Sequence, residues 1–280
     1  MKETIISPDS GLDAFRHTAR SMIANAGTTR ELATRMFIRD VRTMYRQSLL
    51  GYAWIFLPPI ANTMIWIYLN QQKVISVDTG NVPYPLFVLT GNLLWLAFNS
   101  MVLGVLTALI EARTLIAKIN IPHEALLISA FGKASLNAVA PFLLLFPTLL
   151  YYKVPLQSGL LLFPIGLLAL LVLGAAFAVF LLPIATLYTD VSRAIQLLLR
   201  LAFFLTPVIY PLPKGGLAKF VSDINPVTPL LATARSWVIG DGPILTGPFI
   251  AIFLVSIVAL ILGVFIFKIT VPYLVERLSA

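Results

Sequence analysis

The side chains best placed to do chemistry in this sequence are amides, hydroxyls and aromatic rings that recur at helical spacing inside apolar segments. Spacings near three and four residues place such side chains on one face of a helix. Amides and hydroxyls form hydrogen bonds with sugar hydroxyls, and aromatic rings cover the apolar faces of pyranose rings, so the pattern predicts a passage for a neutral, hydroxyl-rich polymer. The candidates are Tyr52, Phe56, Thr63 and Trp66 on one stripe, and Asn92, Trp95 and Asn99 on a second.

The same residue types also have a purely structural interpretation. Trp and Tyr near the ends of membrane spans often anchor a helix at the interface, and Asn or Thr often joins neighbouring helices. Each single residue of the two stripes is therefore open to either interpretation.

Enzymatic and metal chemistry have little support in the composition. The chain has no Cys, and its two His are His17 and His123, which excludes thiolate chemistry and nearly excludes a histidine-based metal site. The pair Gly132-Lys133 is followed by Ala134 and lacks the upstream Gly of an ATP-binding loop. The 12 acidic residues are scattered, without the closely spaced carboxylates of glycosyl transfer or metal-assisted chemistry. We expect no enzyme activity, metal or cofactor in this chain.

The composition indicates an all-α integral membrane protein. Of the 280 residues, 59% are hydrophobic and 11% charged, whereas a soluble domain has about 25% charged residues. A helix needs about 20 apolar residues to cross the hydrocarbon core. Six transmembrane helices are predicted, at 52–69, 86–110, 134–151, 160–188, 195–210 and 248–271.

The distribution of basic residues predicts the orientation of these spans. Fifteen of the 20 Lys and Arg fall on one side: eight before the first span, three between the second and third, two around the start of the fifth and two at or after the end of the sixth. Both termini are therefore predicted to be cytoplasmic. The net charge of +8 then reflects the orientation of the spans in the membrane and does not indicate binding to nucleic acid. Only Glu111 and Arg200 come close to lying within the spans, both towards the cytoplasmic end, which argues against a proton-coupled carrier.

Two spans depart from a plain helix. Pro58 and Pro59 are expected to kink the first span. The fifth has 16 residues, about 24 Å of helix, and is expected to be interrupted at Pro207 and stopped at Pro211. The outer segment 211–246 that follows is long and apolar, with Thr228 and Pro229 as expected N-cap and first helical residue, and an apolar repeat that includes Trp237. It predicts short re-entrant helices in the outer leaflet; the alternative is an extracellular loop with one surface helix.

The segment before the first span has the pattern of an amphipathic helix over 30–50. A capping box, Thr28 to Glu31, precedes a basic arc and a separate apolar arc. The helix is predicted to lie in the cytoplasmic membrane interface with its basic face against lipid head groups; the alternative is that the segment is only a positive-inside flank. The arginines of the basic arc are Arg35, Arg39, Arg42 and Arg46.

The inner segment 113–133 mixes charged and apolar residues and has Pro122 at an expected helix start, followed by His123 and Glu124. Facing the cytoplasm, it could dock a soluble subunit. Charge in a cytoplasmic connection is common, so the pattern alone leaves an ordinary loop open.

Five segments in register resemble the successive signatures of the type-two ABC transporter permeases, and among them the polysaccharide exporters of the O-antigen type. The resemblance extends from about residue 30 to the end of the chain. The segments are RDVRTMYRQSLLGYAW (39–54), PYPLFVLTGNLLW (83–95), LIAKINIPHE (115–124), FFLTPVIYPL (203–212) and NPVTPLLATARSWVIG (225–240).

The resemblance implies a single transmembrane permease domain over 30–280, after an N-terminal cytoplasmic segment 1–29. It implies a homodimer in the bacterial inner membrane with two copies of a separate ATPase subunit, which would bind ATP and Mg, and a lipid-linked polysaccharide as substrate. It further implies a coupling region to the ATPase and a periplasmic gate after residue 211. The coupling residues would be Asn120, Ile121, Pro122, His123 and Glu124, and the gate residues Pro229, Arg235 and Trp237.

Several functions remain possible from the sequence. The first is the permease of an ATP-driven polysaccharide exporter, with a capsule, teichoic-acid or small-molecule exporter as close alternatives. An integral membrane enzyme that acts on polyprenyl-linked sugars would need Asp190, Glu111 or Glu124 for chemistry. A secondary carrier or channel would show ion or voltage dependence without a need for ATP.

Overall fold

The computed structural model describes residues 26–44, 46, 48–112, 123–155, 158–240, 242 and 244–279, and within these ranges every regular element is a helix. Four of these helices are long and apolar enough to cross a membrane. They are α4 (Tyr84–Glu111), the helix from α6 (His123–Val139) through η2 (Ala140–Leu144) to α7 (Leu145–Tyr151), α8 (Phe163–Leu187), and the Thr246–Val271 part of α12 (Thr246–Ser279). The predicted all-α membrane fold is thus confirmed in class.

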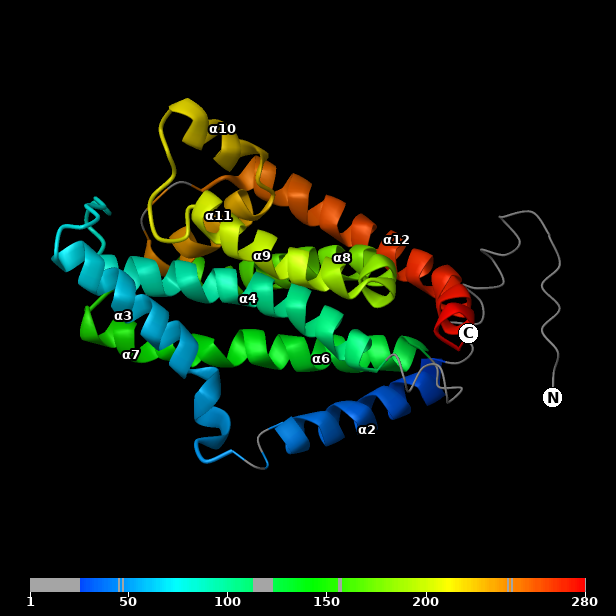
Figure 1. Ribbon diagram of the computed structural model, residues 1–280. Coiled ribbons are helices and arrows are strands. Elements are labelled where there is room, and N and C mark those ends of the chain that lie inside the picture. Colours follow the sequence, from blue (N-terminus) through cyan, green and yellow to red (C-terminus); the bar gives the residue numbers. More distant parts are fainter. Residues whose placement is uncertain are drawn as a thin grey trace.

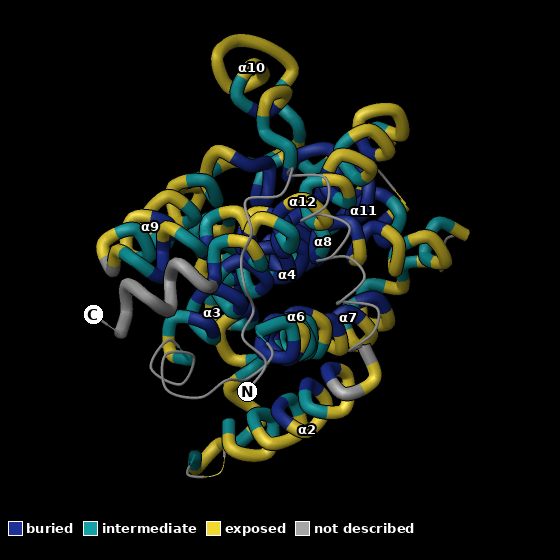
Figure 2. The backbone as a smooth tube through the Cα atoms, turned by 90° about the vertical axis from the view of Figure 1, so that its right-hand side faces the viewer, coloured by how far each residue is buried: buried dark blue, intermediate teal, exposed yellow. Residues whose placement is uncertain are grey.

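Helices α4 and α8 form the centre of the bundle (Figures 1 and 2). Leu93 and Leu106 of α4 and Leu170 and Leu182 of α8 have at most 1% of their surface exposed. Both helices are apolar all round, which is the pattern of a helix packed on every side. Helix α12 packs against α8 along one face and leaves most of its other side chains exposed.

The first and fifth predicted spans are shorter helices than the other four. Helix α3 (Leu57–Gln71) has 15 residues and follows the 3-10 turn η1 (Gly51–Ile55). Pro58 and Pro59 lie in the first turn of α3, where a missing N–H costs nothing, so these prolines open the helix instead of kinking its middle.

Helix α9 (Thr189–Leu205) has 17 residues and begins six positions before the predicted start of the fifth span. It ends at Leu205 because Thr206 precedes Pro207 and is extended, with φ −98° and ψ 139°. A residue before proline is driven out of the helical region by the proline ring. The predicted interruption at Pro207 is therefore confirmed, one turn earlier than the predicted end of the span.

Helix α2 (Ala26–Met44) is the predicted amphipathic helix, shifted towards the amino terminus. Thr28 lies within its first turn, so the predicted capping box does not mark the helix start. Ala33 and Met36 are buried against the bundle, and Phe37 reaches Gly132 of α6, whereas Ile38 is exposed. The apolar face is thus centred on Ala33 and Met36, and α2 runs alongside α6 (Figure 1).

The outer segment contains two helices that differ sharply in burial. Helix α10 (Gly216–Ile224) is largely exposed and projects from the bundle (Figure 2), whereas nearly every residue of α11 (Val227–Ile239) is buried. Helix α11 packs against α4, α8, α12 and the 3-10 turn η3 (Ser158–Leu161). Pro226 takes the N-cap position, so Pro229 is the third helical residue and not the first as predicted.

The beginning of α2 and the end of α12 lie at the same end of the bundle, and α10 lies towards the other end (Figure 1). The first connection, residues 72–83, also lies towards the α10 end (Figure 1). An even number of crossings between α2 and the end of α12 is consistent with this placement.

Candidate functional site

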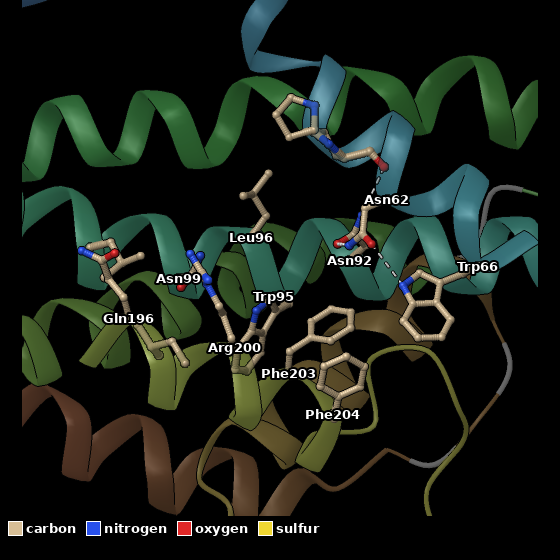
Figure 3. Close-up of a pocket in the computed structure, with 14 residues that line it drawn as sticks. Asn62, Trp66, Asn92, Trp95, Leu96, Asn99, Gln196, Arg200, Phe203 and Phe204 are labelled. Atoms are coloured by element: carbon tan, nitrogen blue, oxygen red, sulfur yellow. Dashed lines mark hydrogen bonds between the residues drawn. The ribbon is translucent and has the colours of Figure 1, made fainter. Parts of the chain in front are cut away.

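A cleft of about 580 Å³ opens between α3, α4 and α9 (Figure 3). Most of the side chains that line it are amides and aromatic rings. Arg200 is the one charged lining residue within the described part of the chain. A cleft of this size belongs to the range of small-molecule sites and could hold a few sugar units at a time. The lining consists of Pro58, Pro59, Asn62, Trp66, Asn92, Trp95, Leu96, Asn99, Leu103, Gln196, Leu199, Arg200, Phe203 and Phe204.

Four of the seven predicted passage residues line this cleft, namely Trp66, Asn92, Trp95 and Asn99. The other three lie elsewhere. Tyr52 is in η1, and its hydroxyl donates a hydrogen bond to the carbonyl of Val41 in α2 over 3.3 Å. Phe56 occupies the break before α3, and Thr63 is buried against α4.

Asn92 is the hydrogen-bonding centre between α3 and α4, and its side chain is 5% exposed. Its Oδ1 accepts a hydrogen bond from Asn62 Nδ2 at 2.9 Å. Its Nδ2 donates to the carbonyl of Pro59 at 3.2 Å and to Thr63 Oγ1 at 3.3 Å. Asn62 in turn accepts a bond from Trp66 Nε1 at 3.1 Å, which fixes the indole at the edge of the cleft. The Asn92 side chain, which the sequence predicts to contact a polymer, therefore also joins α4 to α3.

Aromatic rings join the two short helices across the cleft. Trp66 of α3 lies 6.3 Å from Phe203 and 6.1 Å from Phe204 of α9, between ring centroids. Trp95 of α4 lies 5.9 Å from Phe203 in an edge-to-face arrangement. Such ring pairs stabilise their contact by about 0.5–1.5 kcal/mol each beyond buried area. This ring cluster gives the cleft a wall that suits the apolar face of a sugar.

We expect Asn92→Leu to destabilise the protein by about 1–3 kcal/mol, because it leaves Asn62 and the Pro59 carbonyl without their partner. Asn99→Leu is the matched control, since Asn99 lines the same cleft and its side chain makes no hydrogen bond within the described residues. Thermal unfolding of the detergent-solubilised chain, followed by tryptophan fluorescence, measures both. Equal losses in the two variants would contradict the role of Asn92 as a joint.

Three cleft residues carry chemistry that the sequence did not assign to a site. Neither Asn62 nor Gln196 is among the predicted passage residues, and Arg200 is predicted near the cytoplasmic end of its span. The signal was present in α9, where Gln196, Arg200 and Phe203 follow at spacings of four and three. The sequence did not reveal this pattern, because the predicted span begins at 195 and places Arg200 near its start.

The end of the bundle at which α2 begins and α12 ends contains part of the predicted coupling region (Figure 1). Asn120, Ile121 and Pro122 lie outside the described residues. His123 and Glu124 form the first turn of α6, and the Glu124 carboxylate forms an ion pair with Lys268 of α12, with 2.8 Å between Oε1 and Nζ. This pair ties the start of α6 to the last helix, a contact that sequence spacing could not reveal.

At the opposite end, Arg235 of α11 is buried, with 5% of its surface exposed. Its Nη1 donates hydrogen bonds to the carbonyls of Pro207 at 2.9 Å and Val208 at 3.1 Å. Its guanidinium carbon lies 3.9 Å from the centroid of the Phe87 ring in α4. Trp237 packs on Phe249 of α12, with 5.2 Å between ring centroids. The predicted gate residues thus attach α11 to the chain after α9 and to two long helices.

The four arginines of α2 and the turn after it are exposed. Arg35 pairs with Glu31 at 2.7 Å and Arg39 with Asp40 at 2.8 Å, both within the same helix. Arg42 and Arg46 complete the basic arc. The exposed side chains leave a basic surface on the outside of the bundle, and Arg39 also lines a pocket with residues of α4 and α6.

Over the described part of the chain, no three His, Cys, Asp or Glu side chains come together as a metal site would require. The chemistry of the cleft is therefore built from neutral hydrogen-bonding groups, rings and a single guanidinium.

Comparison with known proteins gives consistent matches. The profile of the family described as ABC-2 type transporter matches residues 31–238. The O-antigen export system permease protein RfbA of Myxococcus xanthus is 28% identical over 202 residues, which cover 71% of this chain and 76% of that protein. Two proteins of the same name from Klebsiella pneumoniae are each 24% identical, over 214 and 215 residues, with 76% of this chain and 81% of each relative covered.

Proposed function

Because the chain belongs to the ABC-2 type transporter family, we propose that it is the transmembrane permease subunit of an ATP-driven exporter of a lipid-linked cell-surface polysaccharide. The relatives named as O-antigen export permeases cover most of the chain and favour an O-antigen type of substrate. The observation that carries the proposal beyond the family is the cleft between α3, α4 and α9, lined by amides and aromatic rings. Those groups suit a neutral glycan.

In this proposal α3 and α9 also cross the membrane, which brings the four long helices to six spans. Their 15 and 17 residues correspond to about 23 and 26 Å of helix, short of a 30 Å core. Two short helices facing a shared cleft thin the barrier where a polymer would pass. With six crossings, both termini lie on one side, which the distribution of basic residues assigns to the cytoplasm.

The outer segment serves as the gate in this proposal. Burial of α11 among α4, α8 and α12 supports a re-entrant position in the outer leaflet, and the exposure of α10 supports a place at the periplasmic surface. Pro229, Arg235 and Trp237 are the proposed gate residues.

The proposed assembly is a homodimer in the bacterial inner membrane, bound to two copies of a nucleotide-binding ATPase subunit. That subunit would hold ATP and Mg and hydrolyse the nucleotide, while this chain forms the passage. Contact with the ATPase is assigned to residues 120–124, at the start of α6. Lipid and glycan are the expected ligands, and nucleic acid is not.

Removal of the gene tests the proposal directly. We expect the polysaccharide to disappear from the cell surface and to accumulate inside the cell, and wild-type chain supplied in trans to restore it. Loss of the ATPase subunit is expected to give the same defect, and affinity purification of the chain is expected to recover that subunit. Unchanged surface polysaccharide, or transport by the chain without an ATPase, would contradict the function.

We expect simultaneous replacement of Arg35, Arg39, Arg42 and Arg46 with Glu to loosen α2 from the inner leaflet, since each basic side chain contributes about 1 kcal/mol near an anionic surface. The amount of chain in the membrane is expected to stay unchanged and export to fall. Lys73→Glu with Lys153→Glu, two exposed lysines outside the segment proposed as the gate, is the control and is expected to leave export unchanged. Normal export by the fourfold variant would remove α2 from the proposed mechanism.

A further inference from the structure

Arg200 stands apart from every other residue that lines the cleft. Arg200 is exposed, and the other 13 lining residues within the described part of the chain are neutral, so the formal charge of this lining resides on the guanidinium. Figure 3 shows the side chain extending from α9 towards α4, beside Asn99. The guanidinium therefore lies within the cleft and is open to a ligand there.

Within the described residues Arg200 has no acidic partner. The ion pairs of the described chain involve Arg35, Arg39, Arg193, Lys219 and Lys268, and none of them reaches the cleft. An ionised group inside a membrane span is expensive unless it is paired or hydrated, and such a group marks a functional site by default. The missing counter-charge is thus the property of Arg200 that needs an explanation.

The surroundings of Arg200 restrict the ligand that could supply this charge. One turn further along α9 lie Phe203 and Phe204, which with Trp66 form the ring cluster. On the other side, Gln196 offers a further hydrogen-bonding group. A single cation between an amide and an apolar ring cluster matches an amphiphile with one anionic group. Arg binds phosphate oxygens through two parallel N–H groups, which makes phosphate its best-matched anion in such a setting.

We propose that Arg200 binds a phosphate group of a lipid-bearing ligand within the cleft, an inference that rests on the proposed export function of that cleft. The phosphate that joins a glycan to a polyprenyl carrier supplies this chemistry, and so does the head group of an anionic phospholipid. In both cases the rings at Phe203, Phe204 and Trp66 take apolar parts of the ligand. Arg200 thereby fixes one end of the ligand relative to the neutral remainder of the passage.

Binding of farnesyl diphosphate and of farnesol to the full-length chain in phosphatidylcholine nanodiscs tests this proposal. Trp66 and Trp95 line the cleft, so quenching of tryptophan fluorescence reports occupancy. Wild-type chain is expected to bind the diphosphate about tenfold more tightly than the alcohol. Arg200→Gln is expected to reduce that ratio to about one, and Arg200→Lys to retain part of it.

Arg193→Gln is the matched control. It removes the same charge from the same helix, but Arg193 lies outside the cleft, is 82% exposed and pairs with Asp190. This variant is expected to keep the full tenfold ratio. Equal binding of diphosphate and alcohol by wild-type chain, or an unchanged ratio in Arg200→Gln, would overturn the proposal.

Nanodiscs that contain phosphatidylglycerol distinguish the two sources of phosphate. If an anionic head group occupies the site, these discs weaken binding of the diphosphate to wild-type chain and leave Arg200→Gln unaffected. If the prenyl phosphate is the ligand, the lipid change has no effect on wild-type chain.

Surface polysaccharide in the gene-removal strain separates this inference from the function on which it rests. If wild-type chain restores the polysaccharide while the two probes bind equally, only the role of Arg200 fails. If wild-type chain does not restore it, the export function fails whatever the probes show.

Discussion

Gly91→Ala is expected to lower the stability of the folded chain by about 3 kcal/mol, the upper part of the range for overpacking a tight contact. A methyl group at this position of α4 would lie 2.1 Å from the carbonyl oxygen of Val208 and 3.2 Å from Nη1 of Arg235. The first of these atoms belongs to the backbone, which cannot rotate away as a side-chain tip can. Accommodation of the methyl therefore requires α4 to separate from the chain that follows α9.

Gly247→Ala is the control for this variant. Gly247 lies in the first turn of α12, and a methyl group there meets no atom within 4 Å. Alanine is favoured over glycine in a helix, so this change is expected to be neutral or to stabilise by up to about 1 kcal/mol. Thermal unfolding midpoints in the same detergent compare the two. A midpoint for Gly91→Ala as high as that of the control would show that α4 and Val208 are not in close contact.

Arg235→Met is expected to cost about 3 kcal/mol, although it keeps an unbranched apolar stem in place of the aliphatic part of the arginine side chain. The change leaves the Pro207 and Val208 carbonyls without their donor, and a buried acceptor without a partner costs about 1–3 kcal/mol. It also removes the cation above the Phe87 ring. Arg235→Lys is expected to be intermediate, because an ammonium group does not offer the planar fork of the guanidinium.

Lys219→Met is the control from the same outer segment. Lys219 lies on α10, is 50% exposed and pairs with Asp223, and exposed ion pairs contribute about 0–1 kcal/mol. Unfolding midpoints and limited proteolysis of the outer segment measure both variants, and early cleavage is expected only for Arg235→Met. Equal behaviour of the two variants would show that the buried guanidinium does not hold α11 in place.

The limits of α4 and α8 could be predicted from the sequence with small errors, because they depend on local signals, whereas the helix predicted at 134–151 begins 11 residues earlier, at His123. The span predicted at 86–110 is α4 (Tyr84–Glu111), which begins just after Pro83. The span predicted at 160–188 covers α8 (Phe163–Leu187), together with the end of the turn η3 that leads into it. Uninterrupted apolar runs leave little choice of element there.

The short helices were predicted less well, since their limits depend on backbone geometry. Before α3, the break at Phe56 resets the helical phase, so Tyr52 and Phe56 could not share a face with Trp66. At α9, the earlier start at Thr189 moved Arg200 from the helix end into the cleft. Hydrophobic periodicity gives the face of a helix but neither its neighbour nor the phase across a break.

The remaining contacts of the site join residues that are far apart in the sequence. Arg235 was counted among the outer basic residues, yet it is buried against carbonyls 28 and 27 positions before it. Asn92 reaches α3 across 29 to 33 positions. Every residue has a backbone carbonyl, so residue types do not show which carbonyl accepts a hydrogen bond. Only the folded chain reveals these partners.

The ion pair between Glu124 and Lys268 links the first turn of α6 mechanically to α12. Helix α6 continues through η2 into α7, a rod of 29 residues and about 43 Å. Any axial push on the first turn of that rod must either drag α12 along or pull the 2.8 Å pair apart. A force on the start of α6 would thus be shared with α12, although the two helices have few other contacts with each other.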